Sequence, residues 1–357
     1  MKRLIIADIK SPVFEGKSSG HFFAVAHNYY ELFQGSTPTK IAGGPIYSSL
    51  FPYAVLPLPE NVDIQKDGRL QSVVKYFRNA RKLFQACSDD VIVVQQGGDI
   101  TFFIACTLFY RKAKNNKLFL IQYSTAAISN RVGRLFYKIA KRKLDGIICP
   151  NHEVGEMFAR PYCVVPDYIF NGNHIQCPPI SYDEKIYDIC FLGRIVVEKG
   201  IDEFLSKFVG APYRMLVAGR VDNPCLEKKL QDIVKGHDNI QLCLEFLSRE
   251  DYQKYLYQSR FCVLNYKGEY SRRSSGVVLD MIFNDVPVIG LECKALEFVK
   301  QNGLGYIYSN LASLNLAEVI TSANYNHYVS QIARYKQSHM VFKHQLGKFL
   351  AIDTQPQ

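Results

Sequence analysis

The chain has 357 residues, 48% of them hydrophobic and 21% charged, which is typical of a globular protein and excludes a disordered or fibrous one. Domains usually hold about 100–200 residues, so the length predicts two. The formal net charge of +10 comes entirely from residues 1–165, with 22 Lys and Arg against 12 Asp and Glu, because residues 166–357 hold 21 of each. This distribution favours an anionic partner for the first half, such as phospholipid, nucleic acid or a phosphate-bearing acceptor.

None of the ten cysteines forms a CxxC pair, and most lie among apolar neighbours. This pattern favours buried thiols in a reducing compartment over disulfides or a metal site. The first apolar stretch is interrupted by Asp8 and Lys10 and is too short for a signal peptide. No run of about 20 apolar residues predicts a membrane span. We therefore expect a cytoplasmic protein, located at the inner face of the plasma membrane if its basic half contacts lipid.

Strands and helices alternate through the first half of the chain. Buried parallel strands are predicted at four apolar runs: 4–7, 91–94, 118–121 and 146–150. Helical patterns follow at 21–33 and 101–112, and a loop with Ser18, Ser19 and Gly20 precedes the first of them. The alternation predicts a parallel sheet covered on both faces.

A proline-rich junction separates this half from the next. Val164–Asp167 predicts a short strand, and 171–182 predicts a linker. Five more strands are then predicted, at 189–192, 215–218, 240–242, 261–264 and 287–290, with helices between them and at 324–350. The predicted domains are 1–167 and 168–335, and we expect a last helix, about 336–357, to pack back on the first domain.

One loop of the second half joins a predicted strand to an amphipathic helix and contains two cations. Gly193 lets the backbone approach a ligand closely. The planar fork of Arg194 suits phosphate oxygens, and Lys199 supplies a point charge to the same group. These residues predict a diphosphate site. The alternative is that both cations pair with Glu198 or Asp202 on the surface.

A second loop leads to a predicted helix start at Ser274, Ser275 and Gly276. Either serine is a natural N-cap, and the free N–H groups of a first helical turn attract anions, especially beside Arg272. The carboxylate of Asp280, one turn further on, has the chemistry to accept hydrogen bonds from ribose hydroxyls. The alternatives are an ordinary capped helix and a solvated aspartate.

Together the two loops resemble a known family. Residues 193–200, Gly-Arg-x3-Glu-Lys-Gly, are similar to the Gly-Arg…Glu-Lys-Gly element of the retaining group 1 (GT4-type) glycosyltransferases. Residues 276–289 are similar to their Gly-Leu…Glu-Ala…Gly-Val-Pro-Val-Ile element. The resemblance covers about 185–305. It implies an α/β protein of the GT-B fold, in which two Rossmann-like domains face each other across a cleft.

The resemblance also implies roles for matching positions. Arg194 and Lys199 would be catalytic, contacting the donor diphosphate and stabilising the leaving nucleoside diphosphate. The implied donor-binding residues are Gly193, Glu269, Arg272, Ser274, Ser275, Gly276, Val277 and Asp280. Ser18, Ser19 and Gly20 would face the donor phosphate and the acceptor across the cleft. Such enzymes are generally metal-independent because protein cations and helix dipoles replace the metal, so we expect neither metal nor cofactor.

The chain departs from the family pattern at two places. Eight residues before Asp280 the family has a glutamate, whereas this chain has Arg272, with Glu269 nearby. After the strand at 118–121 the family often carries a histidine, whereas this chain continues with Gln122. Both departures concern the sugar rather than the nucleotide.

A basic amphipathic helix is predicted from residue 131. Arg131, Arg134, Lys138 and Lys141 lie near one face, and the apolar residues Val132, Leu135, Phe136 and Ile139 lie on another. Such a helix can rest on an anionic membrane. The alternative is a domain helix that packs its apolar side on the sheet.

The sequence thus predicts a hexosyltransferase that moves a sugar from a nucleoside-diphosphate sugar to a glycan or lipid-diphosphate-linked acceptor, with retention, in bacterial surface polysaccharide synthesis. One alternative is a nucleotide-sugar epimerase of the same fold. Another is an inactive nucleotide-sugar-binding homologue, which the arginine in place of a glutamate favours. A nucleic-acid partner is not expected, because no nucleic-acid-binding module is recognisable.

Overall fold

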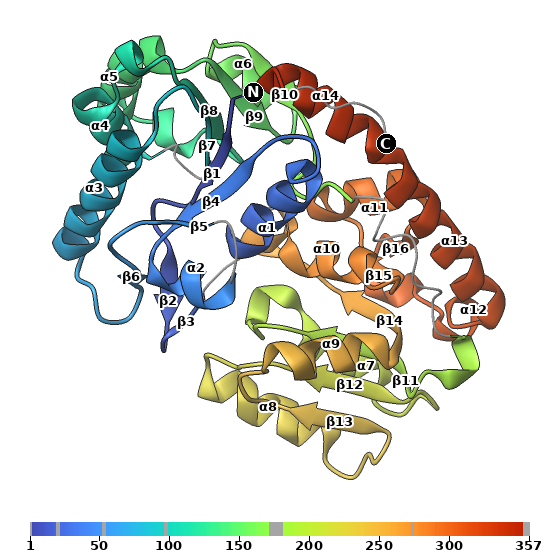
Figure 1. Cartoon of the computed structure of the whole chain (residues 1–357). Coiled ribbons are helices and arrows are strands. Elements are labelled where there is room, and N and C mark those ends of the chain that lie inside the picture. Colours follow the sequence, from blue (N-terminus) through green and yellow to red (C-terminus); the bar gives the residue numbers. More distant parts are fainter. Residues whose placement is uncertain are drawn as a thin grey trace. The chain divides into compact units, whose positions relative to one another are not determined.

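The computed structural model describes residues 2–18, 22–51, 55–95, 99–170, 181–272 and 275–352, with the backbone alone for Arg249, Glu269 and Arg272. The chain divides into two compact units (Figure 1). Unit 1 comprises Met1–Asn171 with His339–Gln357, and unit 2 comprises Gly172–Ser338. The sequence places the two boundaries after residues 167 and 335, a few residues before the boundaries of these units.

Within the described residues, unit 1 contains a seven-stranded sheet in the order β10-β9-β8-β7-β1-β4-β5, and every neighbouring pair is parallel. Its strands are β1 (Leu4–Ala7), β4 (Thr39–Gly43), β5 (Val55–Pro57), β7 (Val91–Gln95), β8 (Lys117–Ile121), β9 (Gly146–Cys149) and β10 (Tyr162–Val164). The central strands β1, β7 and β8 are apolar apart from Gln95 and Lys117 at strand ends, because helices cover both faces of the sheet. A second, small sheet consists of β2 (Pro12–Phe14), β3 (Lys17–Ser18) and β6 (Val62–Asp63).

Two helical layers enclose the unit 1 sheet. One core cluster joins the sheet to α3 (Arg69–Ala86), α4 (Ile100–Phe109), α5 (Arg131–Ala140) and α6 (His152–Met157). The other joins it to α1 (Phe22–Phe33), α2 (Pro45–Leu50) and α14 (Met340–Leu350). Helix α14 therefore contributes to the core of unit 1, although more than 150 residues of unit 2 precede it in the chain.

Helix α5 does not pack its apolar side on the sheet, which was the alternative to a membrane-binding helix. Its buried residues are Gly133, Tyr137 and Ala140, whereas Val132, Leu135 and Ile139 are exposed. Among the apolar residues expected to pack on the sheet, only Phe136 is partly buried against the core. The expectation that the apolar side of this helix packs inward is therefore wrong for the other three.

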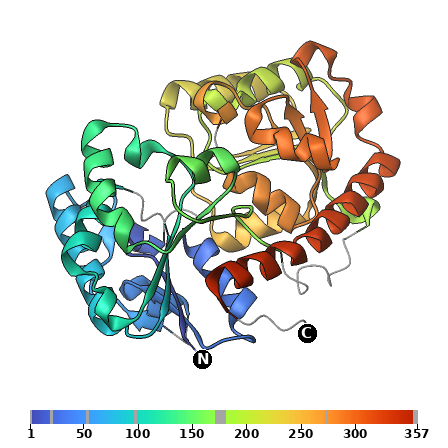
Figure 2. The same ribbon diagram turned by 90° about the horizontal axis from the view of Figure 1, so that it is seen from above.

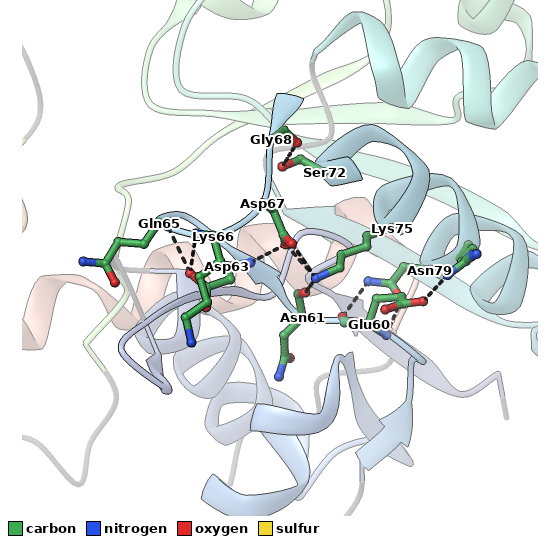
Figure 3. Close-up of polar contacts among 11 residues, drawn as sticks. Glu60, Asn61, Asp63, Gln65, Lys66, Asp67, Gly68, Ser72, Lys75 and Asn79 are labelled. Carbon is green, nitrogen blue, oxygen red and sulfur yellow. Dashed lines mark hydrogen bonds and ion pairs between the residues drawn. The ribbon is translucent and has the colours of Figure 1, made fainter. Parts of the chain in front are cut away.

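The loop from β5 to α3 is fixed by polar contacts at the edge where β1 and β5 end (Figure 3). The amide of Asn79 donates to the carbonyl oxygens of Ile9 and Glu60 at 2.8 and 2.9 Å, and its Oδ1 accepts from the Glu60 N–H. Lys75 Nζ donates to both carboxylate oxygens of the buried Asp67. These contacts, together with the pairing of the short β6 with β2, order the loop.

Unit 2 has, within the described residues, a six-stranded parallel sheet in the order β13-β12-β11-β14-β15-β16. Its strands are β11 (Tyr187–Leu192), β12 (Met215–Ala218), β13 (Ile240–Cys243), β14 (Ser259–Leu264), β15 (Val288–Leu291) and β16 (Gly305–Tyr308). The chain moves outward from β11 in one direction and from β14 in the other. This is the doubly wound Rossmann order, with its switch point between β11 and β14.

Helices also enclose the unit 2 sheet (Figure 2). They are α7 (Ile201–Phe208), α8 (Pro224–Val234), α9 (Arg249–Tyr257), α10 (Gly276–Phe283), α11 (Glu297–Asn302), α12 (Leu316–Val319) and α13 (Ser322–Ser338). The core cluster on one face joins α7, α8, α12 and α13 to the sheet. Among the described residues, no helix of either unit is both long enough and apolar enough to cross a membrane.

Candidate active site

The switch point of unit 2 brings together the two loops that the sequence singles out. One loop leaves the carboxyl end of β11 at Gly193, and the other leaves the carboxyl end of the neighbouring β14 at Asn265. The first loop leads towards β12 and the second towards β15, so the chain moves away from the switch point in opposite directions along the sheet. Ligands of open α/β sheets bind where neighbouring crossovers diverge in this way.

Gly193 has a backbone conformation that only glycine adopts easily. Its φ is +93°, a region that side chains rarely adopt. A Cβ atom here would lie 3.5 Å from a methyl group of Val277 and 3.9 Å from Lys199 Nζ. Gly193, Lys199 and the start of α10 are thus neighbours in space, as the sequence-based site requires.

Lys199 is a buried cation with no anionic partner among the described residues. It is 4% exposed, and its Nζ lies 5.6 Å from the ring centres of both Phe191 and Tyr270. Burial, and to a smaller extent the nearby charge of Arg194, lower its pKa to about 8. An ammonium group that has lost most of its water without gaining a counter-ion provides a strong site for an anion.

Arg194 is exposed and bound to a carboxylate from the next loop. Its Nε donates to Asp222 at 2.5 Å, and Arg220 Nε donates to the other oxygen of Asp222 at 2.9 Å. Burial acts to raise the pKa of Asp222, but the two guanidinium groups outweigh it and the pKa is lowered. The remaining N–H groups of Arg194 are available to a second acceptor.

The surface pairings considered as an alternative are not formed. Asp202 is bound by Lys229 at 2.6 Å, and within the described residues neither Arg194 nor Lys199 contacts Asp202 or the carboxylate of Glu198. Arg194 does have an ion pair, but its partner is Asp222, which the sequence did not indicate.

Side chains after β14 tie the two loops together. The buried Asn265 donates to the carbonyl oxygen of Gly200 at 2.8 Å and accepts from the hydroxyl of Tyr308 at 3.1 Å. The Tyr266 hydroxyl lies 2.8 Å from Ser275 Oγ. The sequence analysis missed these residues, although their place directly after β14 is a signal, since parallel strands collect functional groups at this edge.

Helix α10 begins beside Lys199 with free donors. Ser275 is at the N-cap position, but its hydroxyl contacts Tyr266 and makes no capping bond. Within the described residues, the N–H groups of Gly276 and Val277 have no acceptor, as is usual in a first helical turn. Ser274 lies outside the described residues, and so do the side chains of Glu269 and Arg272, whose backbone forms a short 3₁₀ turn at Gly268–Arg272.

Asp280 is exposed, one turn into α10. Its Oδ2 accepts a hydrogen bond of 3.1 Å from Tyr252 of α9. Burial first, and then the charge of Asp280, raise the pKa of Tyr252, so this phenol remains a donor. A ribose hydroxyl would have to share this carboxylate with Tyr252.

A cavity of about 670 Å³ lies next to these loops. Its lining residues come from the ends of β14 and β15: Tyr266, Lys267, Gly268, Ser271, Leu291, Glu292, Cys293 and Lys294. Tyr266 is common to this cavity and to the contact with Ser275. The switch-point edge therefore offers both anion-binding groups and an open pocket beside them.

The predicted loop of unit 1 is described only in part. Ser18 is exposed in β3, paired with Val13 of β2, whereas Ser19 and Gly20 lie outside the described residues. At the end of β1 the carboxylate of Asp8 is buried and accepts from Tyr47 at 2.7 Å and from the N–H of Ser11 at 3.0 Å. Burial raises its pKa. The described residues contain no cluster of His, Cys, Asp or Glu suited to a metal ion.

No protein-family model and no curated protein matches this chain. Solved structures do match. HepE of Anabaena in complex with UDP and glucose gives a TM-score of 0.59 at 13% identity, over 98% of this chain and 100% of that one. The UDP-forming α,α-trehalose-phosphate synthase of Burkholderia xenovorans gives 0.66 at 10% identity, over 98% and 100%. A variant of S. aureus TarM, in complex with fondaparinux, α-GlcNAc-glycerol and UDP, gives 0.62 at 11% identity, over 98% of both chains. These likenesses confirm the predicted fold, GT-B with two Rossmann-like units.

Proposed function

We propose that this protein is a glycosyltransferase that takes a hexosyl group from a nucleoside-diphosphate sugar. The observation that carries the proposal is Lys199, a buried ammonium group without a counter-ion at the switch point of unit 2. A diphosphate supplies the missing anion. The structural neighbours support this choice of donor, because HepE and TarM were solved with UDP and the Escherichia coli trehalose-6-phosphate enzyme with UDP-2-fluoro glucose.

In this mechanism, protein charges hold the diphosphate and stabilise it as it leaves. Lys199 and the free N–H groups of Arg194 bind the phosphate oxygens, and the N–H groups of Gly276 and Val277 add the partial positive charge of a helix start. Charge that develops on the leaving nucleoside diphosphate is then neutralised without a metal ion. Ser274, Ser275, Arg272 and Glu269 complete the donor loop in this proposal, and Asp280 binds the ribose.

We further propose that the acceptor is a glycan or a lipid-linked glycan of a bacterial surface polysaccharide, and that transfer proceeds with retention. Unit 1, with the loop that contains Ser18, Ser19 and Gly20, would be the acceptor side. The positive charge of residues 1–165 supports an acceptor that carries phosphate. The proposed location is the cytoplasm, at the inner face of the plasma membrane.

A turnover assay tests the proposal. Purified protein is incubated with UDP- and GDP-sugars, with and without lipid-linked or glycan acceptors, and both the released nucleoside diphosphate and the new glycoside are measured. Acceptor-dependent release that is lost in Arg194→Ala and Lys199→Ala supports a transferase. Isomerised donor without acceptor would instead indicate an epimerase, and tight nucleotide binding without turnover across the panel would indicate a binding protein.

A further inference from the structure

One segment of unit 1 carries charge of a single sign. Residues 100–144 contain ten Lys and Arg and no Asp or Glu. The charge of this segment, +10, is therefore equal to the formal net charge of the whole chain. It runs from α4 through β8 to α5, and the two helices pack side by side on the same face of the sheet (Figure 1). The outward sides of α4 and α5 therefore belong to one surface.

The outward side of α5 also exposes apolar side chains. Val132, Leu135 and Ile139, which we call the α5 stripe, are 55%, 57% and 47% exposed. Their spacing of three and four residues places them along one line of the helix. Leu108 of the adjacent α4 is also exposed. Exposed apolar residues gathered on one helix, rather than scattered singly, mark a surface that binds something.

Cations lie alongside this stripe and are not paired. Four cations, which we call the α5 basic row, are exposed, and within the described residues they have no ion pair or hydrogen bond. They are Arg131, Arg134 and Lys138 of α5, and Arg142 of the 3₁₀ turn Lys141–Lys143 that follows it. Lys143 behaves differently, because its Nζ donates to three carbonyl oxygens at the end of α4. Lys143 thus has a structural role, whereas the α5 basic row is available to an external anion.

We propose that α5 binds the surface of an anionic lipid bilayer, with the α5 stripe inserted between the headgroups and the α5 basic row on lipid phosphates. The pairing of the two features identifies this partner. Cations alone would equally suit a nucleic acid or an acidic protein, but the stripe gains free energy only where it leaves water. This proposal goes beyond the donor site and does not depend on it.

The test is co-sedimentation of the full-length protein with phosphatidylcholine vesicles, with and without phosphatidylglycerol. Each cation beside an anionic surface strengthens binding about fivefold, so Arg134→Ala with Lys138→Ala should weaken it about 30-fold. Leu135→Ser with Ile139→Ser should weaken it about tenfold or more. All four side chains are exposed, so neither variant removes core packing. Matched controls are Leu70→Ser, an exposed leucine of α3, and Lys228→Ala, an exposed lysine of unit 2; both should bind like the wild type.

Binding that requires phosphatidylglycerol and is lost in both double variants establishes the proposal. Absence of binding to anionic vesicles overturns it. So does binding that survives loss of the stripe, because a purely electrostatic surface would indicate a soluble polyanion as the partner. Vesicle binding requires no nucleotide, so failure here would leave the proposed donor site unaffected, and failure of nucleotide binding would leave this surface unaffected.

Discussion

Among the described residues of unit 2, three lysines are buried, and their surroundings differ. Lys336 donates to Asp285 at 2.8 Å and to the carbonyl oxygen of Phe283. Lys185 donates to the carbonyl oxygen of Tyr257 at 2.7 Å. Lys199 has only aromatic rings around its ammonium group. Two buried lysines thus have the acceptors that stable folding requires, and the third is left for a ligand.

We predict that Lys199→Met makes the protein more stable at pH 7. The wild type must bury an uncompensated charge, which methionine of similar length avoids. A pKa lowered from 10.5 to about 8 corresponds to a cost of about 3 kcal/mol. The expected gain is about 1–3 kcal/mol, measured by urea unfolding without nucleotide. A loss of stability would show that the ammonium group has an internal partner.

The same pKa predicts a pH dependence of stability. A lysine whose pKa is lower in the folded state binds fewer protons there, so the wild type should gain stability as the pH rises from about 8 towards 10.5. Lys185 also has a pKa of about 8 and contributes in the same window. Lys185 is present in both proteins, so its contribution cancels when the stability of Lys199→Met is subtracted from that of the wild type. Parallel stability curves for the two proteins over this range would contradict the assignment to Lys199.

At the scale of residues, the sequence predicts the groups that belong to motifs but not their partners. Gly193, Arg194 and Lys199 lie in one short segment, so their proximity follows from the chain itself. Asp222 and Asn265 come from other loops, and their contacts arise only when β12 and β14 align beside β11. Such contacts have no signature in a single sequence.

At the scale of elements, the loop that holds Lys199 depends on Gly200. The φ of Gly200 is +61°, and a Cβ atom at this position would lie 2.5 Å from the side-chain amide nitrogen of Asn265. We predict that Gly200→Ala costs about 2 kcal/mol or more, because it combines backbone strain with the loss of a buried hydrogen bond. Gly210→Ala is the matched control, because its Cβ would meet nothing within 4 Å. Equal unfolding midpoints for the two variants would contradict this role of Gly200.

The apolar runs within β1, β8, β11, β12 and β14 predict these strands correctly, because strands covered on both faces are mostly apolar. Strands β4, β5 and β16 of the two large sheets were missed, and so were all three strands of the small sheet. Lys40 lies within β4, β5 is only three residues long and ends in a proline, and β16 mixes glycine with tyrosine. Such sequences lack a distinctive period.

Helix α5 shows why its buried face was not predictable. The helix approaches its neighbours through Gly133, where a Cβ atom would lie 2.1 Å from the carbonyl oxygen of Ala127. The close contact at Gly133 fixes which side of the helix faces inward, so Gly133, Tyr137 and Ala140 are buried while Val132, Leu135 and Ile139 are exposed. A pattern of hydrophobic residues alone therefore predicts the wrong face.

At the scale of the whole molecule, each unit has its own sheet and core, and the chain returns to unit 1 only at α14. Leu346 and Leu350 are fully buried there, and Phe349 packs edge-on against Phe119 of β8. We predict that Leu346→Ala destabilises unit 1 by about 2–5 kcal/mol. Hydrogen exchange should accelerate in the strands of unit 1, while the affinity of unit 2 for nucleotide is retained. Exchange that changes only in unit 2 would contradict the assignment of α14.

The GT-B architecture was predictable because two features agree: the repeated alternation of strands and helices, and two motifs in the expected order. The order of the strands in each sheet was not predictable, because the apolar runs that mark strands do not specify which strands pair. That order places the loops after β11 and β14 side by side, and it supports the donor site more strongly than either motif does.

The central claim is that Lys199 binds a nucleoside diphosphate, and a thermal-shift titration with UDP and GDP tests it most directly. One of the two should raise the melting temperature of the wild type in a concentration-dependent manner. Lys199→Met should bind about 10–100-fold more weakly, the usual loss for a hydrogen-bonded charge, whereas the exposed control Lys228→Met should bind like the wild type. A wild type that responds to neither nucleotide, or a Lys199→Met protein that responds as the wild type does, would contradict the account.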